Sequence, residues 1–211
     1  MGYYEKYLKR TIDTGVSFCG LIALGPLLLV IAAFIKKEDG GDVFYRGVRV
    51  GRDGNLFRIY KFRTMAMNAE ELGGLSTADD DPRITNIGKT LRKYKLDEIP
   101  QLINVLKGEM SLVGPRPEVD EYVKLFTEEE EKILSVRPGI TDWASIWNPD
   151  EGAFLSGYPD PEKAYMEILR PKKLELQQKY VEDVSMRSDM KIIWMTIITI
   201  IGRKATGAES N

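Results

Sequence analysis

Two adjacent carboxylates, Asp97 and Glu98, stand in the stretch of this sequence best suited to chemistry on a phosphate. They open a short apolar segment, and basic residues, among them Arg92, precede it. Arg116 follows between two prolines, which restrict the backbone around a guanidinium whose planar fork fits phosphate oxygens. Because Pro100 is tolerated only in the first turn of a helix, we expect Asp97 to be the N-cap of a helix through the apolar segment.

The carboxylate pair has two interpretations. As a cap and a first-turn acid, Asp97 and Glu98 would simply be favoured by the helix dipole. As ionised groups close to Arg92 and Arg116, they would stay charged at neutral pH. A charged Asp can then hold Mg²⁺ together with a phosphate, or attack phosphorus itself. The neighbouring cations favour this second interpretation.

The composition narrows the chemistry further. The chain has 211 residues, enough for one domain with a real core, and it contains no histidine. Ser-His triads, His-ligated zinc and His general bases are therefore excluded. The single cysteine, Cys19, excludes an internal disulfide. A formal net charge of -2 indicates no global field for nucleic acid, so we expect no nucleic-acid partner.

The segment from residue 44 to 65 mixes basic and aromatic side chains, with Asp53 as its one acid. Such mixing favours a sheet or loop that faces an anionic ligand or anionic lipid headgroups. The acidic run Glu128–Glu131 is instead typical of solvated surface. The basic residues of the mixed segment are Arg46, Arg49, Arg52, Arg58, Lys61 and Arg63.

An uncharged apolar run at residues 16–35 could cross a bilayer, since a helix of that length reaches roughly 30 Å. It has no small-x-small cleavage pattern, which argues against a signal peptide. Basic residues flank both ends, so the positive-inside rule gives no orientation, and Gly25 and Pro26 interrupt its centre. We expect a helix broken there, which enters the membrane and returns on the same face. A straight spanning helix is the alternative.

The apolar run Ile192–Ile201 near the C-terminus is about half the length needed to span a bilayer. Trp194 lies in it and basic residues flank it, which fits a helix at the level of the lipid headgroups. An ordinary packed terminal helix is an equal alternative.

The sequence as a whole predicts an α/β fold, mostly helical with short strands. Residues 1–38 are expected to be the membrane helix, and residues 39–211 a catalytic domain ending in the interfacial helix. A polar loop is expected at residues 76–81. The expected strands are 43–46 and 56–62, joined by a turn at 51–55. The expected helices are 68–73, 86–94, 97–107, 121–134, 162–169, 172–180 and 192–201.

Motifs over nearly the whole chain resemble, in order, those of the bacterial sugar transferase family, the monotopic phosphoglycosyl transferases. No one motif is unique, but the ordered set is highly specific. The chain resembles a minimal catalytic form, without the extra transmembrane helices of larger members. The motifs are the apolar helix with Pro26, Ile59–Met65, Leu96–Leu102, Asn104–Ser111, Gly114–Pro117 and Arg137–Thr141.

The resemblance implies a transferase of the EC 2.7.8 type in polysaccharide and glycoconjugate assembly. Such enzymes use Mg²⁺ and move a phospho-sugar from a UDP-sugar onto undecaprenyl phosphate, at the cytoplasmic face of the bacterial inner membrane. Carried onto this sequence, Asp97 would be the nucleophile, forming a covalent phospho-sugar intermediate, and a metal ligand, with Glu98 assisting. The residues implied to bind phosphate or substrate are Lys61, Arg63, Arg92, Arg116 and Arg137.

The loop after Thr141 departs from the family pattern. Members commonly continue with Gly and soon an Asn/Ser-Gly-Arg triplet, whose basic residue is missing here. The contacts to the sugar and the base therefore stay open. Two other classes also stay open: a metal-dependent hydrolase of nucleotide diphospho-sugars, and a non-catalytic module that binds a membrane surface. A homodimer is compatible with the sequence.

Overall fold

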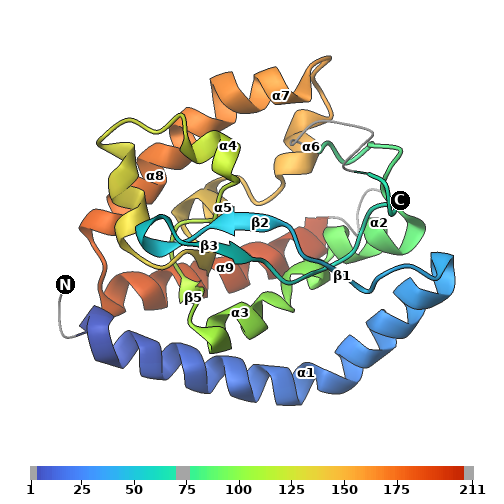
Figure 1. Cartoon of the computed structure of the whole chain (residues 1–211), viewed down its shortest axis with the longest axis horizontal. Helices are drawn as coiled ribbons and strands as arrows, with labels where there is room; N and C mark the ends of the chain where they lie inside the picture. The colour runs from blue at the N-terminus through green and yellow to red at the C-terminus, as the bar shows by residue number, and fades with distance from the viewer. Residues whose placement is uncertain (1–3, 70–76, 207–211) are drawn as a thin grey trace.

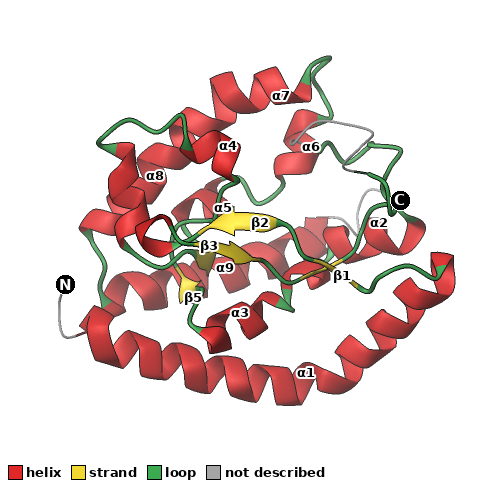
Figure 2. Ribbon diagram, viewed as in Figure 1, coloured by secondary structure: helices red, strands yellow, loops and turns green. Residues whose placement is uncertain are grey.

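Helices make up most of the fold and the strands between them are short, in agreement with the sequence (Figure 2). The computed structural model describes residues 4–69 and 77–206. The α-helices are α1 (Lys9–Asp39), α2 (Asn86–Lys93), α3 (Gln101–Lys107), α4 (Asp120–Val123), α5 (Trp143–Trp147), α6 (Glu151–Leu155), α7 (Pro161–Ala164), α8 (Arg170–Glu182) and α9 (Met186–Thr206). The strands are β1 (Phe44–Tyr45), β2 (Val48–Val50), β3 (Leu56–Arg58), β4 (Lys61–Phe62), β5 (Ser111–Val113) and β6 (Gly139–Thr141).

The described strands pair two by two. β1 pairs with β4 and β2 with β3, both antiparallel, while β5 and β6 are parallel. A Cβ at Gly139 would lie 2.0 Å from the backbone nitrogen of Gly114, so only glycine fits where these two segments meet. The expected strand at 43–46 and helix at 86–94 are confirmed as β1 and α2. The sequence analysis missed β2, β5 and β6.

The expected strand at 56–62 is divided into β3 and β4 by the side chain of Asn104. Asn104 Oδ1 accepts a hydrogen bond from the Tyr60 backbone N–H at 2.8 Å, and its Nδ2 donates to the Arg58 carbonyl at 2.9 Å. Since these two backbone groups bond to a side chain, they are unavailable to a strand ladder. This break separates Lys61 on β4 from the β2–β3 hairpin.

The expected helix at 121–134 is wrong, because the chain forms only the short α4 and then a 3-10 turn at Glu130–Ser135. Thr127 and Glu130 form a capping box between them: Thr127 N–H donates to Glu130 Oε2 at 2.8 Å, and Glu130 N–H donates to Thr127 Oγ1 at 3.3 Å. This reciprocal cap starts a new turn and prevents α4 from continuing.

The expected helices at 162–169 and 172–180 are instead parts of one helical run. α7 passes through a π-helical turn at Tyr165–Leu169 directly into α8. Pro171 directly follows the π-helical turn, at the point of the run where the hydrogen-bond pattern changes. The expected helix at 68–73 falls largely outside the described residues, and Asn68 and Ala69 lie in a turn. Residues 77–81 are irregular, as expected.

The helix α1 runs along the lower edge of the molecule in Figure 1 and bends on the way. Gly25 and Pro26 lie inside it, and the helix continues through both, so the predicted break takes the form of a bend. Proline removes one hydrogen bond of the helix, and the other backbone bonds can still carry the chain past it. α1 is long and apolar enough to cross a membrane, and 11% of its most apolar window is buried.

Both ends of α1 are bound to the same folded body. Near its start, Lys9 forms an ion pair with Asp189 of α9, and Ser111 donates to Asp13 at 2.7 Å. Near its end, Asp39 forms an ion pair with Arg63 at 2.5 Å. The apolar residues that bury this end together are Ile31, Ile35, Phe62 and Leu91. Both ends of α1 therefore contact the rest of the same fold.

The helix α9 is longer than the expected 192–201 and has two different faces. Ile192 is fully buried with Val113 and Tyr180. Trp194 and Ile198 are exposed on another face. The packed terminal helix is therefore confirmed for the buried face, and the placement of the exposed apolar face at the lipid headgroups stays a prediction.

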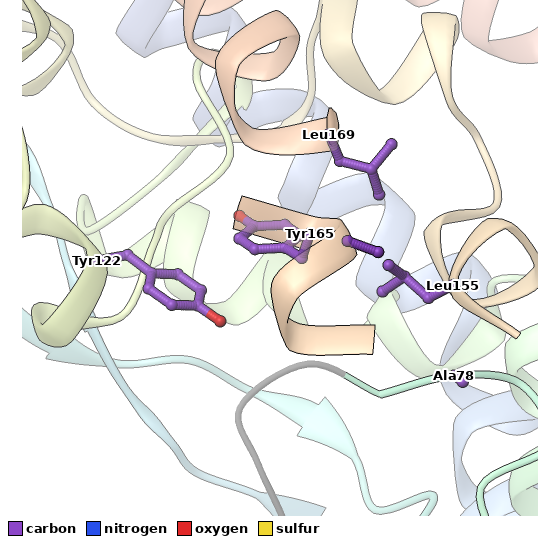
Figure 3. Close-up of a cluster of buried hydrophobic side chains, with 6 residues drawn as sticks. Ala78, Tyr122, Leu155, Tyr165 and Leu169 are labelled. Atoms are coloured by element: carbon purple, nitrogen blue, oxygen red, sulfur yellow. The ribbon is translucent and has the colours of Figure 1, made fainter. Parts of the chain in front are cut away.

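A cluster around Tyr165 fixes the π-helical turn to the rest of the fold (Figure 3). Its ring stacks on that of Tyr122, with centroids 5.1 Å apart. Leu155 of α6 and Leu169 at the end of the turn pack in the same cluster. These contacts join α4, α6 and the α7–α8 run beside the cleft described below.

Replacing Asn104 should test the strand break. Asn104→Ala truncates a fully buried side chain and removes its part-buried hydrogen bonds to the Tyr60 N–H and the Arg58 carbonyl, so we expect a loss of about 1–3 kcal/mol in the free energy of unfolding. Chemical denaturation in detergent, followed by circular dichroism, measures it. Asn55→Ala removes an exposed turn contact and should cost at most about 0.5 kcal/mol. Equal losses in the two variants would contradict the role given to Asn104.

Candidate active site

Asp97 and Glu98 lie in a 3-10 turn, Leu96–Glu98, between α2 and α3. The expected helix at 97–107 with Asp97 as its N-cap is therefore wrong, because α3 begins at Gln101 after Pro100. Lys95 has a left-handed φ of 55°, which turns the chain sharply before the two acids. The turn lets the adjacent carboxylates enter different environments.

Glu98 is clamped by two cations. Lys61 of β4 forms an ion pair with Glu98 Oε1 at 2.8 Å, and Arg116 donates from both terminal nitrogens to the two Glu98 oxygens. Burial opposes the charged form of Glu98, but Arg116 and Lys61 outweigh it and hold its pKa well below the usual range. Glu98 is thus a fixed anion whose hydrogen-bonding capacity is largely used.

Asp97 has the opposite character. It is 8% exposed, and its buried Oδ1 has no hydrogen-bond partner among the described residues. Burial first and the charge of Glu98 second raise its pKa, while Lys61, Lys95 and Arg92 oppose that rise. An unpaired buried carboxylate oxygen costs free energy, and a bound ligand or metal ion could supply the missing partner. Asp97 Oδ1 is therefore available for contact with a ligand.

The remaining predicted cations fall into two groups. Arg92 donates to Thr64 Oγ1 at 3.0 Å, and burial lowers its pKa while Asp97 is the foremost of the carboxylates that oppose this shift. Lys61, Arg92 and Arg116 are therefore gathered around the acids. Arg63 instead binds Asp39, and Arg137 donates to the Gly108 carbonyl at 3.0 Å. The structure does not bring Arg63 and Arg137 to the carboxylates, and their contact with substrate stays a prediction.

Asp142, which the sequence analysis did not select, holds the backbone of Arg116. Between Pro115 and Pro117 only Arg116 has a backbone N–H, and it donates to Asp142 Oδ2 at 3.2 Å. Gln177 donates to the same oxygen at 3.2 Å. Asp142 Oδ1 accepts from the backbone N–H of Ser145 at 2.7 Å and so caps α5. These partners lie far apart in sequence, and an Asp three residues before a Ser was the only local signal.

A second missed group surrounds Lys173 of α8. Its ammonium lies 2.9 Å from Glu118, 3.2 Å from Glu151 and 3.0 Å from the Tyr165 hydroxyl. Burial disfavours its charge, but Glu118 and Glu151 outweigh burial and raise the pKa of Lys173 well above its usual value. Lys173 is therefore a permanent cation, and it lies at the wall of the same cleft as Arg116.

The cleft beside these residues has a volume of about 1260 Å³. Glu98, Arg116 and Lys173 line its polar part, and Trp147 of α5 adds an aromatic wall. The apolar lining comes from α1, α3 and α9 and includes Val16, Leu24, Leu102, Ile193, Ile197 and Ile200. This arrangement brings fixed charges and an apolar surface to one open site.

The family model for bacterial sugar transferases matches residues 4–203. The chain belongs to the bacterial sugar transferase family. The exopolysaccharide production protein ExoY of Sinorhizobium fredii is 36% identical over 90% of this chain and 83% of its own length. An Aeromonas hydrophila relative, UDP-N-acetylgalactosamine-undecaprenyl-phosphate N-acetylgalactosaminephosphotransferase, is 37% identical over 92% of this chain. The Escherichia coli UDP-glucose:undecaprenyl-phosphate glucose-1-phosphate transferase is 34% identical over 95% of it.

The matches differ in how much of each relative they cover. This family member spans 44% of the Aeromonas protein and 42% of the Escherichia coli protein, so it corresponds to less than half of those enzymes. The family-model match, at residues 4–203, contains both acids and the cations around them.

A complete protein metal site is absent from the part of the chain that the structure describes, where no three Asp, Glu, His or Cys side chains gather. Mg²⁺ fits such a place nevertheless, because it is commonly held by one or two carboxylates together with substrate phosphates. Asp97 is the acid with an unpartnered oxygen, whereas both oxygens of Glu98 are engaged. The residues present therefore fit a metal held mainly through Asp97.

Exchanging Asp142 for Asn should separate its two roles in this family member. Asn caps a helix about as well as Asp, but its amide nitrogen cannot accept from Arg116 and Gln177. We expect Asp142→Asn to lower the rate of sugar-phosphate transfer roughly tenfold to a hundredfold, as displaced catalytic groups do. A transfer assay with saturating substrates measures it.

Asp160→Asn is the matched control. Asp160 caps α7 in the same way, by accepting from the Lys163 N–H at 3.0 Å, but it is not the partner of the Arg116 backbone, which is Asp142. That variant should keep its activity. If both variants lost activity equally, helix capping would explain the effect and the role of Asp142 in holding Arg116 would be wrong.

Proposed function

We propose that this protein transfers a phospho-sugar from a UDP-sugar to undecaprenyl phosphate through a covalent intermediate on Asp97. The names of the Aeromonas and Escherichia coli relatives describe such a transfer for those proteins and support it here. The observation that carries the proposal is the unpartnered, buried Oδ1 of Asp97 beside a fully clamped Glu98. One acid is held rigid and the other is left to react.

In the first half-reaction, an Asp97 carboxylate oxygen attacks the phosphorus that bears the sugar. The bond from this phosphorus to the bridging oxygen of the diphosphate breaks, and UMP leaves with the electron pair. The intermediate is an acyl phosphate between Asp97 and the phospho-sugar. Arg92 and Arg116 lie close to the two acids and would offset the charge on the phosphoryl oxygens.

In the second half-reaction, a phosphate oxygen of undecaprenyl phosphate attacks the same phosphorus. The bond to Asp97 breaks, the carboxylate is restored, and the product is a polyprenyl-diphospho-sugar. Glu98 keeps Lys61 and Arg116 in place through both steps, because it binds the two cations at once. Asp97 would hold Mg²⁺ with the diphosphate, and the bound ion would offset the negative charge of the phosphates.

The proposal includes a monotopic placement, with α1 re-entrant in the cytoplasmic face of the bacterial inner membrane. The ion pairs at the two ends of α1 support it, since Lys9 and Asp39 both bind the catalytic body. A helix that crossed the bilayer would place one of these ends on the far side, away from its partner. In this arrangement residues 1–38 form the membrane part and residues 39–211 the catalytic part.

Replacing Asp97 tests the nucleophile. Asp97→Asn should lower transfer at least about a thousandfold, because a neutral amide cannot form the intermediate. The measurement is transfer of label from a radiolabelled UDP-sugar to undecaprenyl phosphate with Mg²⁺. The exposed Asp53→Asn should behave as the unchanged protein. Full activity in Asp97→Asn would show that Asp97 is not the nucleophile. In the unchanged protein, release of sugar phosphate into water without acceptor would instead indicate a hydrolase. Absence of any turnover in the unchanged protein would indicate a binding module.

The intermediate itself can be trapped. Without acceptor, labelled UDP-sugar should leave label on the denatured protein and release an equal amount of UMP. Undecaprenyl phosphate added afterwards should remove that label. Release of UMP only when both substrates are present, with no labelled protein, would contradict the two-step reaction and favour direct transfer.

Cysteine labelling tests the placement of α1. In a Cys19→Ser background, single cysteines at Glu5 and Lys37 should both react with a membrane-impermeant reagent in inside-out vesicles. Neither should react in right-side-out vesicles. Labelling of the two positions from opposite sides would show that α1 spans the membrane.

A further inference from the structure

The cleft has an apolar wall that the reacting phosphates do not explain. Val16 and Leu24 of α1 form part of it, together with Leu102 of α3 and Ile193 and Ile197 of α9. A nucleotide diphospho-sugar is polar along its whole length, so it makes little use of such a wall. The phosphates of the donor would instead use the cations in the polar part of the cleft, such as Arg116.

The size of the cleft also indicates room for a ligand other than the donor. At about 1260 Å³ it exceeds the range of about 300–1,000 Å³ that is typical for a single small-molecule ligand. Two substrates must reach the same phosphorus in turn, and they must use different parts of the space around it. The apolar part is therefore available to a ligand other than the donor.

The apolar wall is also open. Val16 is 52% exposed and Ile197 45% exposed, although both line the cleft. Exposed apolar surface that is contiguous with a binding cleft marks an interaction site. Because α1 is the helix that could enter a membrane, its side of the cleft would face hydrocarbon. A lipid tail could then enter from the side without passing through water.

We propose that the groove between α1, α3 and α9 binds the isoprenoid tail of the acceptor, with its phosphate at Arg116. The proposal rests on the function proposed above and adds the place of the acceptor. Charges fit this orientation, since Lys93 and Lys95 line the cleft together with Arg116. An anionic headgroup meets these cations while the tail lies along Leu24 and Ile197.

Filling the groove tests this. Ile197→Trp should raise the KM for undecaprenyl phosphate at least about tenfold, because the larger ring takes the volume of the tail. The KM for the UDP-sugar and the covalent labelling by donor alone should stay unchanged. Initial rates with each substrate varied in turn, in detergent micelles of fixed composition, measure the effect.

The neighbouring Ile198→Trp is the matched control. Ile198 is 51% exposed on the same helix and does not line the cleft. It should leave both KM values unchanged, as should Ile22→Trp on α1 when compared with Leu24→Trp. If Ile197→Trp and Ile198→Trp raised the KM for the lipid equally, general membrane contact would explain the effect and the groove assignment would be wrong.

Two further outcomes separate this proposal from the proposed function. Loss of donor labelling in Ile197→Trp, with the lipid KM unchanged, would give the apolar wall to the donor and overturn the groove assignment. Absence of donor labelling in the unmodified protein would instead count against the covalent reaction. A short-chain prenyl phosphate should show a smaller difference between Ile197→Trp and the unmodified protein, because its tail fills less of the groove. An equal difference with short and long acceptors would contradict the proposal.

Discussion

The ion triad of Lys61, Glu98 and Arg116 is the interaction on which the rest of the site depends. Buried charges are tolerated only when they are paired and hydrogen-bonded, so the fold must deliver three distant segments to one point. Asn104 ends β3 and places Lys61 on its own short strand. Asp142 holds the backbone of Arg116. Much of the irregular structure between the helices serves this one requirement, because a regular strand or helix would point the charges elsewhere.

The triad also explains why neighbouring acids behave differently. Asp97 is buried and Glu98 is half-buried, and burial raises the pKa of a carboxylate unless cations outweigh it. Glu98 has Lys61 and Arg116 in direct contact, so its pKa falls well below the usual value. Asp97 has its cations at a distance and the charge of Glu98 beside it, so its pKa rises. The same turn therefore holds two acids with opposite pKa shifts, because only Glu98 has cations in direct contact that outweigh burial.

The sequence predicted which residues gather at the site better than it predicted the backbone that holds them. Residue types and ordered motifs were enough to select the residues that the structure gathers. These are Asp97, Glu98, Lys61, Arg92 and Arg116. The expected cap failed because the left-handed backbone at Lys95 is a property of the folded chain. Arg63 was grouped with Lys61, yet it binds Asp39 at the end of α1. The Asp142 and Lys173 groups join segments distant in sequence, and only the three-dimensional packing reveals them.

The two substrates differ so much in solubility that they set opposite demands on one phosphate site. The site must admit a water-soluble diphosphate from one side and a lipid phosphate from the other, and the reacting phosphorus must not move between them. Anchoring both ends of α1 to the body meets the second demand, since the membrane helix cannot swing away from Glu98 and Arg116. The polar and apolar walls of the cleft meet the other demand, because they suit a water-soluble substrate and a lipid substrate. The covalent intermediate proposed on Asp97 fits both demands, because the phospho-sugar would stay fixed while one partner leaves and the other arrives.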